Sequence, residues 1–127
     1  MAIRSELTVR LPNSPGALAG VCRLLSDERV NILVLGLEPT GQLHLVVDNP
    51  VLAAGALRER HYQVAEHPVL LVRASNEPGA LASTLRLVSE AGVNVNYGYG
   101  GAADGAAAAA IVLGVDDAQR ASAAAGL

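Results

Sequence analysis

The chain has 127 residues and a net charge of −3, and half of its residues are hydrophobic, although it contains no Phe or Trp and only three Tyr. Such a chain offers neither the basic surface nor the aromatic platforms on which nucleic-acid binding depends, so we expect no nucleic-acid partner. Cys22 is the only cysteine, which excludes an internal disulfide and a cysteine-based zinc site. No apolar run approaches the roughly 20 residues that cross a bilayer, and the start lacks the long apolar stretch of a signal peptide, so we expect a cytoplasmic protein with no membrane partner.

The first elements are a strand and a helix. Apolar residues alternate with polar ones from Leu7 to Leu11, which is typical of a half-buried strand. Ser14 is a suitable N-cap, and Pro15 suits the first position of a helix, where its missing N–H costs nothing. The helix that follows carries one apolar stripe at the spacing i, i+3, i+4, i+7, formed by Leu18, Val21, Cys22 and Leu25.

Two strands, a helix and a strand complete this first copy. We predict strands at 31–37 and 43–47, joined by a turn at 38–41. Asp48-Asn49-Pro50 again places capping residues before a proline and opens a helix that ends near Arg60. A fourth strand follows at 62–66, with His67-Pro68 as the joint to the rest of the chain. The order βαββαβ predicts an α+β protein of the ferredoxin-like kind.

The rest of the chain repeats this pattern. Asn-Ser-Pro-Gly-Ala-Leu at 13–18 returns as Asn-Glu-Pro-Gly-Ala-Leu sixty-three residues later, at 76–81. The second copy predicts a strand at 69–74, a helix at 78–91, a strand at 93–99, a Gly/Ala-rich turn, and then a strand and a helix. The alanine run at 106–110 favours helix by propensity, and only the repeat assigns its downstream part to a strand. We therefore predict two tandem modules, 1–67 and 68–127, of which the second lacks its last strand.

Two features predict association with another chain. A module without its last strand leaves unpaired backbone groups on the neighbouring strand, and we expect a contact between chains to satisfy them. In the strand at 31–37, strict alternation places Ile32 and Val34 on one side and Leu33, Leu35 and Leu37 on the other. Only one of these apolar rows can face the module's own helices, so the other needs a cover. The cover we expect is the other copy or a second molecule, and we expect a homodimer.

The Pro-Gly loops are candidate ligand sites. A helix start offers free N–H groups and the positive end of the helix dipole, which favour an anion. Gly16 and Gly79 keep side chains away from the loop, and Asn13 and Asn76 each carry a donor and an acceptor. These residue types are also ordinary in turns and caps, so the residues alone leave both readings open.

The full pattern of Asn-x-Pro-Gly-x-Leu, a helix and then Val-Asn-Ile (30–32) or Val-Asn-Val (93–95) resembles the ACT domain, a family of small regulatory modules. The resemblance covers about residues 5–127 as two tandem copies, and is to free-standing tandem ACT proteins in particular. It implies an allosteric, regulatory protein that binds a free amino acid where two ACT modules meet, and an enzyme of amino-acid metabolism as a partner. The implied contacts are Asn13, Gly16, Ala17, Leu18, Asn31 and Ile32 in the first module and Asn76, Gly79, Ala80, Leu81, Asn94 and Val95 in the second.

Other functions are less well supported by the residues. An enzyme needs a nucleophile, acid or base with an orienting partner, and His44, His61 and His67 are scattered without metal-ligand spacing. We therefore expect no catalytic residue, no metal and no cofactor. A scaffold or regulatory subunit that associates without a ligand remains an alternative. Tyr97 and Tyr99 share a strand side with Val95, and we expect them to face the core.

Overall fold

The computed structural model describes residues 2–125, so the outer limits of the two predicted modules, residues 1 and 127, lie outside the described residues. The chain forms two compact units. The first unit is Ser5–His67, and the second consists of Pro68 onward together with the residues up to Arg4. Strands and helices follow the repeated ferredoxin-like order in an antiparallel α+β architecture, which confirms the predicted fold class. No helix within residues 2–125 is long and apolar enough to cross a membrane.

The first unit has the strand order β2-β3-β1-β4. Its elements are β1 (Ala2–Arg10), α1 (Ala17–Asp27), β2 (Ile32–Leu37), β3 (Gln42–Val47), α2 (Pro50–Glu59) and the start of β4 (Val64–Ser75). One apolar core joins the strands to both helices, and it is built from aliphatic side chains such as Leu7, Leu25, Leu45 and Leu57, all fully buried. The helical stripe predicted for α1 supplies Val21 and Leu25 to this core.

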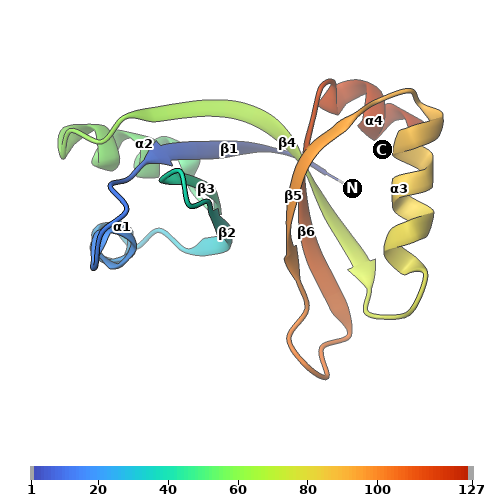
Figure 1. Cartoon of the computed structure of the whole chain (residues 1–127), viewed down its shortest axis with the longest axis horizontal. Coiled ribbons are helices and arrows are strands. Elements are labelled where there is room, and N and C mark those ends of the chain that lie inside the picture. Colours follow the sequence, from blue (N-terminus) through green and yellow to red (C-terminus); the bar gives the residue numbers. More distant parts are fainter. Residues whose placement is uncertain (1, 126–127) are drawn as a thin grey trace. The chain divides into compact units, whose positions relative to one another are not determined.

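The second unit contains the remainder of β4, α3 (Ala80–Glu90), β5 (Val95–Gly101), β6 (Ala108–Val115) and α4 (Ala118–Ala124). Its strands follow the order β4-β6-β5. Both helices lie on one side of these strands (Figure 1). The core between them includes Leu70, Val72, Val88 and Leu113, and small residues of α4 close it.

The alanine run belongs to a strand. Ala108, Ala109 and Ala110 pair with Ser75, Ala74 and Arg73 of β4 and begin β6. This confirms the strand that only the repeat predicted. The hydrogen bonds to β4 on one side and β5 on the other outweigh the helix propensity of alanine.

The second module has no strand after α4 within the described residues, as predicted, but its β4 does not end the sheet there. β1 is the neighbour of β4, and the residues of β1 up to Arg4 belong to the second unit. The chain therefore supplies a strand for this edge itself, and a contact with another chain is not needed to satisfy it. The joint predicted at His67-Pro68 lies within β4, which continues through both residues and passes from the first unit to the second there.

The Pro-Gly loops are turns that precede the helices. α1 and α3 begin at Ala17 and Ala80, each after a glycine in the left-handed region, with φ 83° and ψ −6° for Gly16 and φ 86° and ψ −11° for Gly79. These dihedrals match the third position of a type II turn, whose second position favours proline. Backbone hydrogen bonds close both turns, from Ala17 N–H to Ser14 O and from Ala80 N–H to Glu77 O, each 3.3 Å.

The sequence predicted Ser14 as the N-cap and Pro15 as the first helical residue. Both predictions are wrong, because the N-cap is Gly16 and the helix begins at Ala17. An added Cβ at Gly16 or Gly79 would meet nothing within 4 Å, so packing does not require a glycine at either position. The positive φ does, because residues with a side chain rarely adopt it. The repeated motif thus encodes a repeated turn, and the space beside each glycine stays open.

Strict alternation fails in β2 because of a bulge between Ile32 and Val34. After it, Leu35 lies opposite Leu45 and Leu37 opposite Leu43, and directly opposed residues share one face of a sheet. Leu35 and Leu37 therefore lie on the helix side together with Ile32, so the predicted placement of Ile32 opposite these two leucines is wrong. They are nevertheless 38% and 47% exposed, because β2 is the outermost strand of the first unit.

A second bulge, between Val95 and Tyr97, separates the tyrosines of β5 from the core. Tyr97 lies opposite Gly114 and Tyr99 opposite Val112, on the face away from the core residue Leu113. Their rings stack with centroids 6.4 Å apart. The expectation that both tyrosines share the side of Val95 and face the core is wrong.

Candidate functional site

The first Pro-Gly turn borders a small cavity. It has a volume of about 130 Å³, roughly the space of four liquid waters, which suits a small ligand or the main-chain part of an amino acid. It is formed by the β1–α1 loop, the first turn of α1 and the end of β2, and is lined by Leu11, Pro12, Asn13, Ser14, Gly16, Ala17, Leu18, Ala19, Leu37, Glu38 and Gly41. The structure thus brings together four of the six contacts predicted for the first module.

Hydrogen-bond donors at this cavity are unused. Ala17 N–H is bound within the turn and Gly20 N–H donates to Gly16 O at 2.9 Å, whereas the N–H groups of Leu18 and Ala19 have no acceptor within the described residues. These two N–H groups point out of the positive end of the α1 dipole. The arrangement favours a carboxylate or another small anion.

Asn13 adds a side-chain donor and acceptor to the same cavity. It is exposed, and in the described part of the chain its amide forms no hydrogen bond. An amide offers an acceptor oxygen to an ammonium group and donors to a carboxylate. Asn13 can therefore take either end of a zwitterion without breaking an existing contact.

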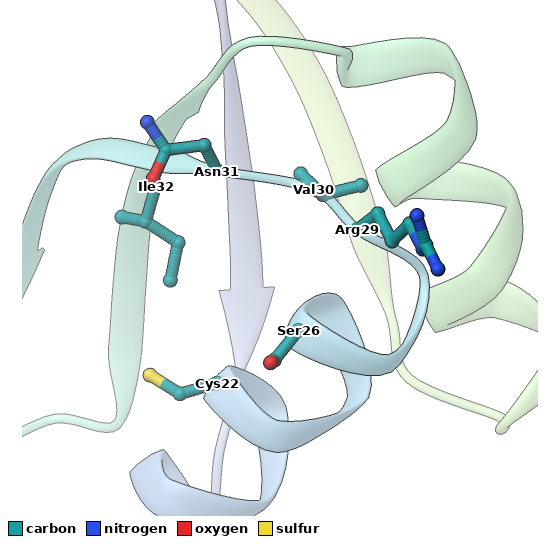
Figure 2. Close-up of a pocket in the computed structure, with 6 residues that line it drawn as sticks. All are labelled: Cys22, Ser26, Arg29, Val30, Asn31 and Ile32. Carbon is teal, nitrogen blue, oxygen red and sulfur yellow. The ribbon is translucent and has the colours of Figure 1, made fainter.

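Asn31 and Ile32, the remaining contacts predicted for the first module, line a different cavity of about 430 Å³. Figure 2 shows Cys22 and Ser26 on α1 at one side of this cavity and Asn31 and Ile32, at the entry to β2, at the other. The backbone of Asn31 is held by Asp48, whose Oδ1 accepts from Asn31 N–H at 2.9 Å and whose N–H donates to Asn31 O at 3.0 Å. The Asn31 amide itself has no partner within residues 2–125.

The corresponding amides of the second module are already engaged. Asn76 Nδ2 donates to Ala106 O at 2.9 Å, and Asn94 Nδ2 donates to Asn96 Oδ1 at 2.9 Å. Asn96 Nδ2 in turn donates to Asp116 Oδ1 at 2.8 Å. These bonds use one N–H of each amide and fix its orientation, whereas the Asn13 and Asn31 amides form no hydrogen bond within the described residues, so the two modules differ in what they offer a ligand.

The other predicted residues of the second module keep the backbone arrangement of the first. Gly79 forms the turn, Ala80 and Leu81 lie half-buried in the first turn of α3, and Val95 is partly exposed at the start of β5. The sequence predictions missed Asn96, whose Oδ1 accepts from the Asn94 amide, and Asp116, whose Oδ1 accepts from Asn96. The polar repeat at 94 and 96, followed by acidic residues at 116 and 117, gives no signal of this contact.

Comparison with known proteins identifies the family. A family model described as an ACT domain pair matches residues 1–124. The chain belongs to this family. A search of the curated proteins found no match.

Solved structures agree with the assignment of an ACT domain pair. A protein from Bacteroides thetaiotaomicron is 26% identical with a TM-score of 0.84, and the match covers 98% of this chain and 87% of that chain. The regulatory subunit of aspartate kinase from Thermus thermophilus, in its ligand-free form, is 16% identical with a TM-score of 0.71, covering 98% and 92%. Aspartokinase III of E. coli, in complex with lysine and aspartate, is 18% identical with a TM-score of 0.59, covering 98% and 32%. The two kinase likenesses show a shared fold.

The first ACT module also holds a buried carboxylate–imidazole cluster that the sequence predictions missed. Glu6 is fully buried on β1, and its Oε1 accepts from His67 Nε2 at 2.7 Å and lies 3.1 Å from His44 Nδ1. The second ring nitrogen of His44 lies 2.7 Å from Glu38 Oε2. His44 donates to both carboxylates only as an imidazolium. The cluster therefore links β1, β3, β4 and the turn after β2.

The charge of His44 is favoured by these partners. Burial lowers the pKa of His44, but the hydrogen bonds to Glu38 and Glu6 and the charges of both carboxylates together raise this pKa above 6.5. His44 lies on a strand, as expected, although it is buried. In the described part of the chain no group of three or more His, Cys, Asp or Glu side chains could hold a metal ion.

The cluster fastens the turn that forms one wall of the small cavity. Glu38 and Gly41 both line that cavity. Gly41 O accepts from Leu11 N–H at 2.8 Å, and Arg10 donates to Thr40 O at 3.1 Å. The only sequence signal for the cluster was the placement of polar residues between the core positions of β1 and β3, which normally indicates a solvated face.

Proposed function

We propose that this ACT domain pair is a cytoplasmic regulatory module without a reaction of its own, which binds a free amino acid at a boundary between ACT modules. The observation that carries the proposal is the cavity at the first Pro-Gly turn. There the free N–H groups of Leu18 and Ala19 would take the carboxylate of the ligand. The Asn13 oxygen would accept from its ammonium group.

Asn31 and Ile32 would complete the site from a second ACT module, as the family resemblance implies. Both lie at the start of the edge strand β2, and the Asn31 amide has no partner within the described residues. The second-module set, Asn76, Gly79, Ala80, Leu81, Asn94 and Val95, is the weaker candidate because the side-chain nitrogens of Asn76 and Asn94 already donate within the module. A ligand of about ten heavy atoms in an open site would bind with micromolar to millimolar affinity.

Association into a homodimer belongs to this proposal. β2 is the outermost strand of the first unit, and its Leu33, Leu35 and Leu37 side chains are 42%, 38% and 47% exposed. An edge strand with exposed apolar side chains is a pairing surface. Sedimentation equilibrium at about 10 μM would contradict the dimer if it gave the mass of one chain.

Thermal unfolding in the presence of each of the twenty amino acids, at about 10 mM, tests ligand binding. A ligand at 100 times its dissociation constant stabilises the folded state by about 2.7 kcal/mol. Lysine and aspartate are the first candidates, since the E. coli aspartokinase III structure contains both. Asn13→Ala should remove the stabilisation and Asn76→Ala should leave it. No stabilisation by any of the twenty would overturn the amino-acid proposal.

The alternative is a subunit that regulates a metabolic enzyme by association alone. The fold shared with regulatory subunits of aspartate kinase and the exposed leucines of β2 favour this second candidate. It predicts no amino-acid effect on unfolding, together with a stable complex with an enzyme of amino-acid metabolism. An aspartate kinase that lacks its own ACT domains is the partner to test first by size-exclusion chromatography.

A further inference from the structure

A third cavity of the first module lies on its helix layer, separate from the Pro-Gly turn. Its volume is about 510 Å³, within the range of small-molecule sites. Gly20, Arg23, Leu24 and Asp27 supply one wall, at the spacing i, i+3, i+4, i+7 that places them on one face of α1. Arg60, at the end of α2, and Tyr62 supply the other.

The polar groups around this cavity are mostly donors without acceptors. Arg23 and Arg60 are exposed, and neither forms an ion pair or a side-chain hydrogen bond within residues 2–125. The hydroxyl of Tyr62 likewise has no acceptor there, although its ring packs against the core. Two guanidinium groups and a hydroxyl around one cavity form a local positive site on a chain of net charge −3.

The internal repeat provides a reference for Arg23. The equivalent residue of α3 is Arg86, which lies 3.7 Å from Glu90 in an i, i+4 ion pair. Asp27 has the same spacing from Arg23, yet these two side chains form no ion pair. The arginine of the first module thus remains available, while its counterpart is in an ion pair.

Gly20 keeps the cavity open. An added Cβ at this position would meet only the Tyr62 hydroxyl, at 3.9 Å, so the absence of a side chain is not required by packing. Alanine is the better helix former, and a glycine inside α1 costs about 1 kcal/mol relative to it. A larger residue here would extend into the space between the two arginines.

We propose that this cavity binds a small, doubly charged oxyanion, such as a diphosphate or a dicarboxylate. Each guanidinium presents a planar fork that matches a phosphate or carboxylate group, and two forks call for two such groups or one multiply charged group. Tyr62 donates a third hydrogen bond, and Leu24 forms an apolar wall. Asp27 is the one carboxylate of the lining.

Isothermal titration calorimetry of the full chain with sodium pyrophosphate and, separately, with sodium succinate tests this site at constant ionic strength. Saturable binding of pyrophosphate alone assigns a phosphate ligand, and saturable binding of succinate alone assigns a dicarboxylate; either supports the proposal. Arg23→Gln and Arg60→Gln should each weaken binding about tenfold, as expected for a lost hydrogen bond to a charged group. Arg86→Gln, at the equivalent position of α3, is the matched control and should bind as the wild type does.

Gly20→Leu separates the cavity from surface charge, because it keeps both arginines and fills the space. It should also weaken binding at least tenfold, with thermal unfolding showing that the fold is retained. Three results would overturn the proposal: no saturation by either anion below about 10 mM, equal losses in Arg86→Gln and Arg23→Gln, or unchanged affinity in folded Gly20→Leu. None of these depends on whether an amino acid binds at Asn13.

Discussion

Replacement of His44 by glutamine should change the pH dependence of folding stability. His44 is held as an imidazolium between Glu6 and Glu38, at 3.1 Å and 2.7 Å. Its pKa is raised in the folded state, because the two carboxylates outweigh the effect of burial. The stabilisation from this charge is therefore fully present below the unfolded pKa of about 6.5 and is lost as the pH rises through the higher folded value.

The size of the effect follows from the two contacts. A hydrogen bond between charged groups contributes about 1.5–3 kcal/mol, and the contact with the fully buried Glu6 belongs in this range. The contact with Glu38 contributes less, about 0.2–1 kcal/mol, since the Glu38 side chain is 53% exposed and screened by water. His44→Gln should thus lower the free energy of unfolding by about 2–4 kcal/mol at pH 6. His67 continues to donate to Glu6, so the buried carboxylate keeps a partner.

Urea unfolding at intervals from pH 5.5 to 8.5 measures this dependence. Above pH 6.5 the folded wild type binds more protons than the unfolded chain, so its free energy of unfolding should fall with pH, by at most about 1.4 kcal/mol per unit. The slope should be shallower in His44→Gln, and the two curves should converge at high pH. His61→Asn, at an exposed residue with φ 68° that asparagine tolerates, serves as the control. A constant difference between wild type and His44→Gln over the whole range would refute the assignment of the charge to His44.

The remaining predictions concern packing, and urea unfolding at pH 7 measures both. Gly114→Ala should lower the free energy of unfolding by about 1–3 kcal/mol, because the added Cβ would lie 2.1 Å from the ring of Tyr97. Gly98→Ala is the control: its Cβ would meet a methyl group of Leu113 at 3.3 Å, so the free energy of unfolding should fall less. Leu25→Ala, at a fully buried core position, should cost about 2–5 kcal/mol, and Val51→Ala, at an 80% exposed one, less than about 0.5 kcal/mol; equal losses would contradict the core assignment.

The order of strands and helices could be predicted from the sequence because each copy carries its own local signals. The alternation at 7–11 and the apolar stripe ending at Leu25 depend only on residues a few positions apart. Comparison of the copies added β6, whose alanines indicate a helix when read alone. The turn was recognised but misplaced, since Pro15 is compatible with both a helix start and a type II turn, and the dihedrals of Gly16 distinguish the two.

The candidate site could be predicted only in part. The sequence indicated Asn13 and Asn76 as equivalent, and it could not indicate that Asn76 binds Ala106 O while Asn13 remains unbound. That difference depends on a loop thirty residues away along the chain. Arg23 and Arg60 gave no signal as a pair for the same reason, because α1 and the end of α2 come together only in the folded unit.

The sequence by itself thus determined the two ACT modules, their turns and the apolar faces of their helices. Tertiary structure decided the two bulges, which place Leu35 on the helix side of β2 and Tyr97 on the side of β5 away from the core. It also decided that β1 lies beside β4 and that Glu6 is buried with His44. Periodicity and turn chemistry act between neighbours in the chain. Register, burial and charge pairing depend on segments far apart in sequence, whose contacts no local pattern encodes.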